Sequence, residues 1–153
     1  MRKNIIYSLL LVVAALFAGC DSRLDIEKHG NMGDQNDFYQ TDEQTEQAVA
    51  SMYSNLKGLY YNWFFTKNLL SDDVWCGGGQ RGDNTSLEQL NEYTYGTDNG
   101  MIQGVFSGLY GLIYQSNLVI EKVADDTPAK KRAIAEAKFF RAWANFELVT
   151  LWG

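Results

Sequence analysis

Apolar residues recur at helical spacing in four stretches of the chain, and the first stretch is TDEQTEQAVASMYSNLKGLY, residues 41–60. Thr41 precedes Gln44 by three residues, the spacing of a capping box in which each side chain satisfies a backbone N–H group of the other residue. Two acidic residues follow Thr41, where they favour the positive end of a helix dipole. The pattern therefore predicts a helix that begins after Thr41. Its predicted buried face consists of Val49, Met52, Leu56 and Leu59.

The next apolar stretch, WFFTKNLLSDDVW at residues 63–75, predicts a second, separate helix that ends between Ser71 and Asp73. From Cys76 to Gly100 the periodicity breaks, because CGGGQRGDN and GTDNG are rich in the residues of tight turns. SLEQLNEYTY, residues 86–95, lies between them and fits either a helix or a loop. A long loop in a compact domain is more often functional than idle, so this region is a candidate for function.

Residues 101–123, MIQGVFSGLYGLIYQSNLVIEKV, predict a third helix with few charged residues. A membrane span is the alternative, but Ser116, Asn117 and the glutamines make burial in lipid costly. The glycines Gly104, Gly108 and Gly111 are better explained by the close approach of a neighbouring helix. We expect Asn117 to form a buried cap or a hydrogen bond between helices. The predicted apolar face consists of Ile102, Phe106, Leu109, Ile113, Ile120 and Val123.

The fourth helix is predicted over AKKRAIAEAKFFRAWANFELVTLWG, residues 129–153, with Pro128 in its first turn. Two apolar stripes run along it, and two apolar faces predict a helix buried between partners, as in stacked helical hairpins. One stripe is Ala133, Ala137, Phe140, Ala144, Leu148 and Leu151, and the other is Phe139, Trp143 or Ala142, Phe146 and Val149. The dense apolar run at the end of the sequence leads us to expect that the domain is incomplete.

The net charge of the chain limits which partners it can bind. The formal net charge is −6 over 153 residues. Without residues 1–19, which hold two positive charges and no negative one, it falls from −6 to −8. Such a surface repels phosphate backbones, so we expect no nucleic-acid partner.

The N-terminus, MRKNIIYSLLLVVAALFAGC, has the three parts of a secretory signal: a positive start, an apolar run too short to span a bilayer, and small residues before the cleavage position. Cys20 directly follows Ala18 and Gly19, so the segment resembles a bacterial lipoprotein signal in which the thiol receives a lipid. Phe17 stands where leucine is usual in that signal. A plain signal peptide followed by an incidental cysteine is the alternative interpretation.

The second cysteine, Cys76, is then most simply a lone thiol, since a lipidated Cys20 forms no disulfide. His29 is the only histidine, and no cysteine or histidine spacing matches a zinc site. A thiol protease would lack a base for the same reason. We therefore expect no metal and no cofactor.

Four segments resemble the N-terminal part of the SusD/RagB family of outer-membrane lipoproteins that bind nutrients at the surface of Bacteroidetes. The segments are DFYQTDEQTEQAVASMY, LLSDDVW, YQSNLVIEKV and AEAKFFRAWANFELVTLWG. The last is the most specific, and the residues that match the family pattern are Ala137, Phe140, Arg141, Ala142, Phe146, Leu148 and Gly153.

The resemblance implies an all-α fold of tetratricopeptide-like helix pairs with a long loop, seated on a SusC-like TonB-dependent transporter, and no catalysis. It implies a lipoprotein signal peptide at residues 1–19, a lipidated Cys20 with a tether over residues 20–40, and an incomplete SusD-like N-terminal domain over residues 41–153. Family members continue for several hundred residues beyond the matched region. The implied location is the outer membrane, with the protein lipid-anchored and exposed at the surface.

Aromatic residues near the long loop are candidates for stacking on sugar rings, because the C–H faces of pyranoses are apolar. Packing in the core is the alternative for each of them, and the stronger one for Trp63. In the resembling family this loop region often contributes to the ligand site, with polar side chains taking the hydroxyls. The candidate ligand residues are Trp75, Arg81, Asp83, Asn84, Tyr93 and Tyr95.

Asp72 and Asp73 invite an acid–base interpretation, but adjacent carboxylates do not easily face one substrate. We expect one of them to pair with Arg141, whose guanidinium lies between two apolar stripes and needs a partner.

Three functions compete at this stage. The first is a surface lipoprotein that binds glycans or other oligomers and passes them to a transporter. The second is a lipid-anchored helical-repeat scaffold that binds only proteins. The third is a glycosidase, which needs two carboxyl groups roughly 5–9 Å apart in a cleft. No such pair is identifiable in the sequence, so the first is preferred.

Overall fold

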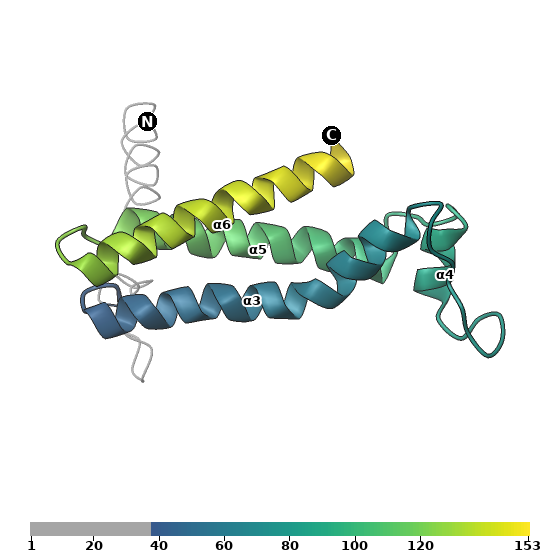
Figure 1. The fold of residues 1–153 in the computed structure, drawn as a ribbon, viewed down its shortest axis with the longest axis horizontal. Helices are drawn as coiled ribbons and strands as arrows, with labels where there is room; N and C mark the ends of the chain where they lie inside the picture. The colour runs from purple at the N-terminus through teal and green to yellow at the C-terminus, as the bar shows by residue number, and fades with distance from the viewer. Residues whose placement is uncertain (1–37) are drawn as a thin grey trace, which may run out of the picture. The chain divides into compact units, whose positions relative to one another are not determined.

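The computed structural model describes residues 38–153, which contain four α-helices and no strand. The predictions for the signal peptide, for Cys20 and for residues 20–37 lie outside the described residues. Figure 1 shows the helices, and their bounds are α3 (Asp42–Leu69), α4 (Thr85–Asn91), α5 (Gly100–Lys122) and α6 (Pro128–Trp152). The predicted all-α fold class is confirmed, whereas the tetratricopeptide-like pairing stays a prediction.

The α3 helix is a single helix of 28 residues, so the prediction of two separate helices was wrong. Its start is as predicted, since the Thr41 hydroxyl accepts a hydrogen bond from the Gln44 N–H at 3.2 Å and the Gln44 side chain accepts one from the Thr41 N–H at 3.1 Å. The apolar pattern loses its clarity after Leu59, but the buried face continues at seven-residue intervals. The buried positions at this interval are Thr45, Met52, Leu59 and Thr66.

Spacing of three and four residues governs the other long helices as well. The buried positions of α5 are Val105, Leu109, Leu112, Ser116 and Val119, and those of α6 are Lys130, Ala133, Ala137, Phe140, Ala144 and Glu147. This is the spacing of helices that pack nearly parallel or antiparallel to one another. The predicted α5 face is confirmed at Leu109 and Val123, which are buried, but it was wrong at Phe106, which is 43% exposed. Val105, one residue earlier, is fully buried in its place.

The α5 helix runs antiparallel to both α3 and α6 and packs against both (Figure 1). The predicted close approach at the glycines is confirmed on the α3 side. A Cβ atom on Gly108 would lie 2.9 Å from Leu59 Cδ1, one on Gly111 would lie 3.2 Å from Asn55 Nδ2, and one on Gly104 would overlap the Asn62 side chain.

The α6 helix begins as expected, with Pro128 in its first turn and the Thr127 hydroxyl accepting a hydrogen bond from the Lys130 N–H. Of its two apolar stripes, the one that contains Ala137 and Phe140 is largely buried against α3 and α5. The other does not meet the prediction of a helix covered on both faces, because Phe139 is 66% exposed and Phe146 is 61% exposed.

None of the helices in residues 38–153 has the length and apolarity needed to cross a membrane.

Candidate functional site

The candidate ligand residues lie around the segment that joins α3 to α4. Leu69 at the end of α3 forms a small second core with Leu87 and Leu90 of α4, and Leu90 is fully buried. This core fixes the short α4 helix beside the end of α3. The connecting segment, which carries Trp75 and the glycine-rich loop, is therefore held between two fixed points.

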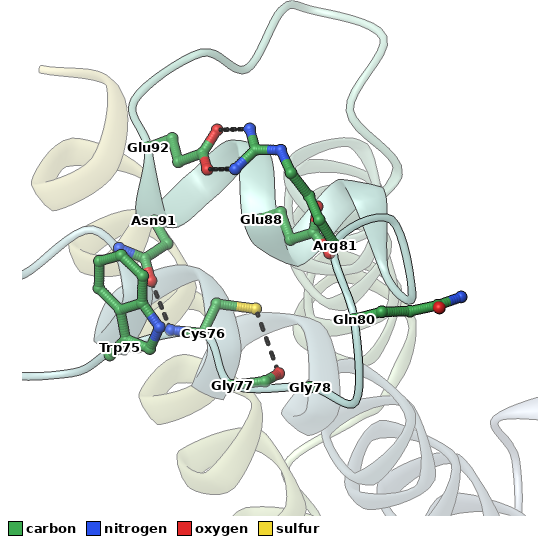
Figure 2. Close-up of a pocket in the computed structure, with 9 residues that line it drawn as sticks. All are labelled: Trp75, Cys76, Gly77, Gly78, Gln80, Arg81, Glu88, Asn91 and Glu92. Atoms are coloured by element: carbon green, nitrogen blue, oxygen red, sulfur yellow. Dashed lines mark hydrogen bonds and ion pairs between the residues drawn. The ribbon is translucent and has the colours of Figure 1, made fainter.

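Two open hollows flank Trp75, whose side chain is 79% exposed. The first hollow has a volume of about 280 Å³ and is lined by Trp75, Cys76, Gly77, Gly78, Gln80, Arg81, Glu88, Asn91 and Glu92 (Figure 2). The second has a volume of about 290 Å³ and is lined by Ser71, Asp72, Asp73, Val74, Trp75, Asn91 and Tyr93. Trp75 and Asn91 line both hollows, so the exposed indole of Trp75 forms part of the wall of each.

Arg81 closes one side of the first hollow through an ion pair with Glu92. The two guanidinium nitrogens donate to the two carboxylate oxygens at 2.6 and 2.8 Å, a bidentate arrangement that is visible in Figure 2. The hydrogen bond with Arg81 holds the pKa of Glu92 below its usual value, and the same bond raises the pKa of Arg81. Arg81 is thus held in place by the Glu92 carboxylate.

Asp83 and Asn84 hold the backbone of the loop and of α4. One Asp83 carboxylate oxygen accepts from the backbone N–H groups of Gly79 and Gln80, at 2.7 and 3.0 Å. The Asn84 side chain caps α4 by accepting from the Leu87 N–H at 3.3 Å. Neither residue is among those that line the two hollows.

Tyr93 lies at the second hollow and Tyr95 does not. The Tyr93 hydroxyl donates to the backbone carbonyl of Leu70 at 3.0 Å, which ties the segment after α4 to the end of α3. Its φ of 55° falls in the left-handed region, where residues other than glycine are uncommon. Tyr95 is 39% exposed and lines neither hollow.

The predicted ion pair of Arg141 is not formed in residues 38–153. The Arg141 guanidinium donates instead to the Asn117 side-chain oxygen at 3.1 Å, which confirms a helix-to-helix hydrogen bond for Asn117. Asp72 and Asp73 lie beyond the end of α3 and are exposed. Because Arg141 is only partly buried, a neutral amide suffices as its partner.

Among the residues of the first hollow that were not predicted as ligand residues, three come from α4 and its C-cap: Glu88, Asn91 and Glu92. They follow one another at helical spacing, so they share the face of α4 that meets the loop. Glu88 accepts from the Gly82 N–H at 2.7 Å, and Asn91 accepts from the Cys76 N–H. Recognising SLEQLN as a helix would have revealed this shared face.

Cys76 lies in the wall of the first hollow, where its surroundings favour the thiol over the thiolate. Burial is the largest cause of a raised pKa of its thiol, and the charges of Glu88 and Glu92 add to it. A raised pKa lowers the fraction of reactive thiolate at neutral pH. In the described part of the chain, no three His, Cys, Asp or Glu side chains gather closely enough to hold a metal ion.

Fold and site together describe an all-α protein with an exposed tryptophan between two open polar hollows. A family model described as SusD-like, starch-binding associating with outer membrane, matches residues 24–153. The chain therefore belongs to the SusD-like family, which confirms the resemblance in its sequence.

The curated relatives are longer than this chain. A SusD-like protein of Bacteroides ovatus is 34% identical over 160 aligned positions, which cover 95% of this chain and 28% of the relative. Two SusD-like proteins of Formosa agariphila are each 26% identical over 152 positions, which cover 99% and 96% of this chain and 30% of each relative. The chain thus spans less than a third of the length of these relatives. No solved structure matches it.

Proposed function

We propose that this protein is a non-catalytic outer-membrane lipoprotein that binds nutrient oligomers, foremost glycans, and delivers them to a SusC-like TonB-dependent transporter. The observation that carries the proposal is the match of residues 24–153 to a family described as starch-binding and associated with the outer membrane. In this proposal Cys20 carries the lipid that holds the protein at the cell surface.

The geometry beside Trp75 supports the glycan part of the proposal. Sugar rings stack on aromatic faces while their hydroxyls bond to polar groups, and an indole that is 79% exposed offers such a face. Polar side chains of Arg81, Asn91 and Glu92 lie in the walls of the adjacent first hollow. The site is open, as binding along an oligomer requires, and Arg81, Trp75 and Tyr93 of the predicted set line it.

Binding is tested with the longest form of the protein that its gene encodes, made with Cys20→Ala so that it stays in solution. Oligosaccharides of starch, xylan, mannan and galactan are titrated by calorimetry. We expect Trp75→Ala to weaken binding by about tenfold, because aromatic stacking adds about 1 kcal/mol beyond simple burial. Trp152→Ala, at the end of α6, is the matched control and should leave binding unchanged. Equal affinities of wild type and Trp75→Ala would exclude Trp75 from the site.

The anchor is tested in a Bacteroidetes host fed with a clickable palmitate analogue, comparing wild type with Cys20→Ala. Label on wild type alone, together with loss of the protein when intact cells are treated with protease, supports a lipid-anchored surface protein. If neither form takes up label, Cys20 is not a lipid site and the anchored function is refuted.

A further inference from the structure

Carboxylates dominate the charge around Trp75. Glu88 and Glu92 line the first hollow, and Asp72 and Asp73 line the second. Arg81 is the only cation that lines either hollow, and both of its terminal nitrogens already bond to Glu92. The remaining three carboxylates, Asp72, Asp73 and Glu88, form no salt bridge within residues 38–153.

From this arrangement we infer that the ligand bound beside Trp75 is an uncharged glycan, and that the site rejects glycans that carry uronate or sulfate groups. This inference rests on the proposed glycan-binding function and names the ligand class of the same site. The inference therefore excludes acidic polysaccharides as ligands of this site.

The chemistry of recognition differs for the two ligand classes. The hydroxyls of a neutral sugar donate hydrogen bonds, and ionised carboxylates are strong acceptors for them. A uronate or sulfate group donates nothing and adds negative charge within a few ångströms of Asp72, Asp73 or Glu88. Repulsion between like charges at such distances, summed over these carboxylates, lowers affinity by about tenfold or more.

Arg81 does not remove this repulsion. An acidic ligand that paired with Arg81 would have to displace Glu92 from contacts of 2.6 and 2.8 Å. The displaced Glu92 carboxylate would then face the same hollow as an additional unpaired negative charge. The exchange replaces the carboxylate on Arg81 by the anionic group of the ligand, and the freed Glu92 carboxylate leaves the hollow with more unpaired negative charge than before.

The experiment measures how tightly each oligosaccharide probe binds and whether it binds at the first hollow. It uses the longest encoded form of the protein, carrying Cys20→Ala. The neutral probes are oligosaccharides of glucose, xylose, mannose and galactose. The acidic probes are oligogalacturonate, oligomannuronate and chondroitin sulfate oligosaccharides of similar length. Location is read from the rate at which iodoacetamide alkylates Cys76, which lines the first hollow, followed on the Cys76 peptide by mass spectrometry.

We expect at least one neutral probe to bind and to slow alkylation of Cys76, and every acidic probe to bind at least about tenfold more weakly. The variant Asp72→Asn/Asp73→Asn/Glu88→Gln should recover at least about tenfold in affinity for an acidic probe. The control variant is Glu43→Gln/Glu121→Gln/Asp125→Asn, which removes three exposed carboxylates that do not line either hollow. It should not raise the affinity for any acidic probe.

The outcomes separate the inference from the function beneath it. An acidic probe that binds wild type as tightly as the neutral ones and protects Cys76 overturns the inference and leaves glycan binding standing. A neutral probe that binds without protecting Cys76 also overturns it, because the ligand then lies elsewhere. If no probe of either class binds, the proposed glycan-binding function itself fails.

Discussion

Two glutamates that form ion pairs, Glu147 and Glu92, have different surroundings. Glu147 of α6 is 3% exposed, and one of its oxygens accepts from Trp63 Nε1 at 2.8 Å and from Lys67 Nζ at 2.9 Å. Glu92 at the end of α4 is 32% exposed in its side chain and is held by Arg81. The first links α3 to α6 across the core, and the second holds a surface loop.

Replacing Glu147 by alanine should loosen the contact between α3 and α6. The partly buried indole N–H of Trp63 would lose its acceptor, which costs about 1 kcal/mol. Hydrogen exchange measured by mass spectrometry should show faster exchange in peptides of α3 and α6. Lys138→Ala, an exposed charge on the same helix, is the control. Unchanged exchange in Glu147→Ala would mean that the contact carries no stability.

The carboxyl group of Glu92 should titrate below the usual value of 4.5, because its hydrogen bond with Arg81 lowers the pKa. A lowered pKa in the folded state stabilises the fold at pH values above that of the unfolded chain, and this contribution is lost as pH falls through the folded value. Side-chain carboxyl NMR measures the titration. Arg81→Gln should return the pKa of Glu92 toward 4.5, and an unshifted value in wild type would contradict the ion pair.

At the scale of elements, two helical glycines differ in whether a neighbouring helix packs against them. Gly108 of α5 faces Leu59 closely, whereas a Cβ atom on Gly58 of α3 would meet nothing within 4 Å. Both glycines lie within helices, where glycine costs about 1 kcal/mol relative to alanine. Only the surroundings distinguish them.

The two alanine substitutions should therefore have opposite signs. Gly58→Ala should raise the free energy of unfolding by about 0.5–1 kcal/mol, because it adds helix propensity without a clash. Gly108→Ala should lower it by about 1 kcal/mol, because overpacking at Leu59 outweighs the same gain. Urea unfolding followed by far-UV circular dichroism measures both. A stabilised Gly108→Ala would show that the helices lie further apart than the structure has them.

At the scale of the molecule, α6 carries an apolar face that nothing in residues 38–153 covers. Phe139, Phe146 and Val149 are between 61% and 66% exposed and recur at helical spacing. Contiguous apolar surface of this kind promotes association. The buried stripe of the same helix, by contrast, packs on α3 and α5.

The chain of residues 20–153, with Cys20→Ala, should self-associate with rising concentration, as measured by sedimentation velocity. Phe139→Lys/Phe146→Lys should shift the population toward monomer while circular dichroism shows unchanged helix content. Tyr110→Lys/Tyr114→Lys on α5 exchanges two exposed aromatic residues elsewhere and should shift it less. A wild-type chain that stays monomeric at high concentration would contradict association through this face.

The sequence was sufficient for features that depend on residues close together along the chain. The capping box at Thr41, the proline in the first turn of α6, the buried stripe of α6 and the tight approach at the α5 glycines were all predicted from local spacing. The family motifs likewise lie in short segments. In each case the signal is a repeat or a pairing within one or two helical turns.

The tertiary structure decided what depends on residues far apart in the chain. It joined two predicted helices into α3, whose buried face continues from Leu59 to Thr66 without a break. It gave Arg141 the amide of Asn117 in place of a carboxylate, and it brought Glu92 to Arg81 beside Trp75. Periodicity shows which side of a helix is apolar, but contacts between helices depend on how those sides pack, and no local pattern encodes that packing.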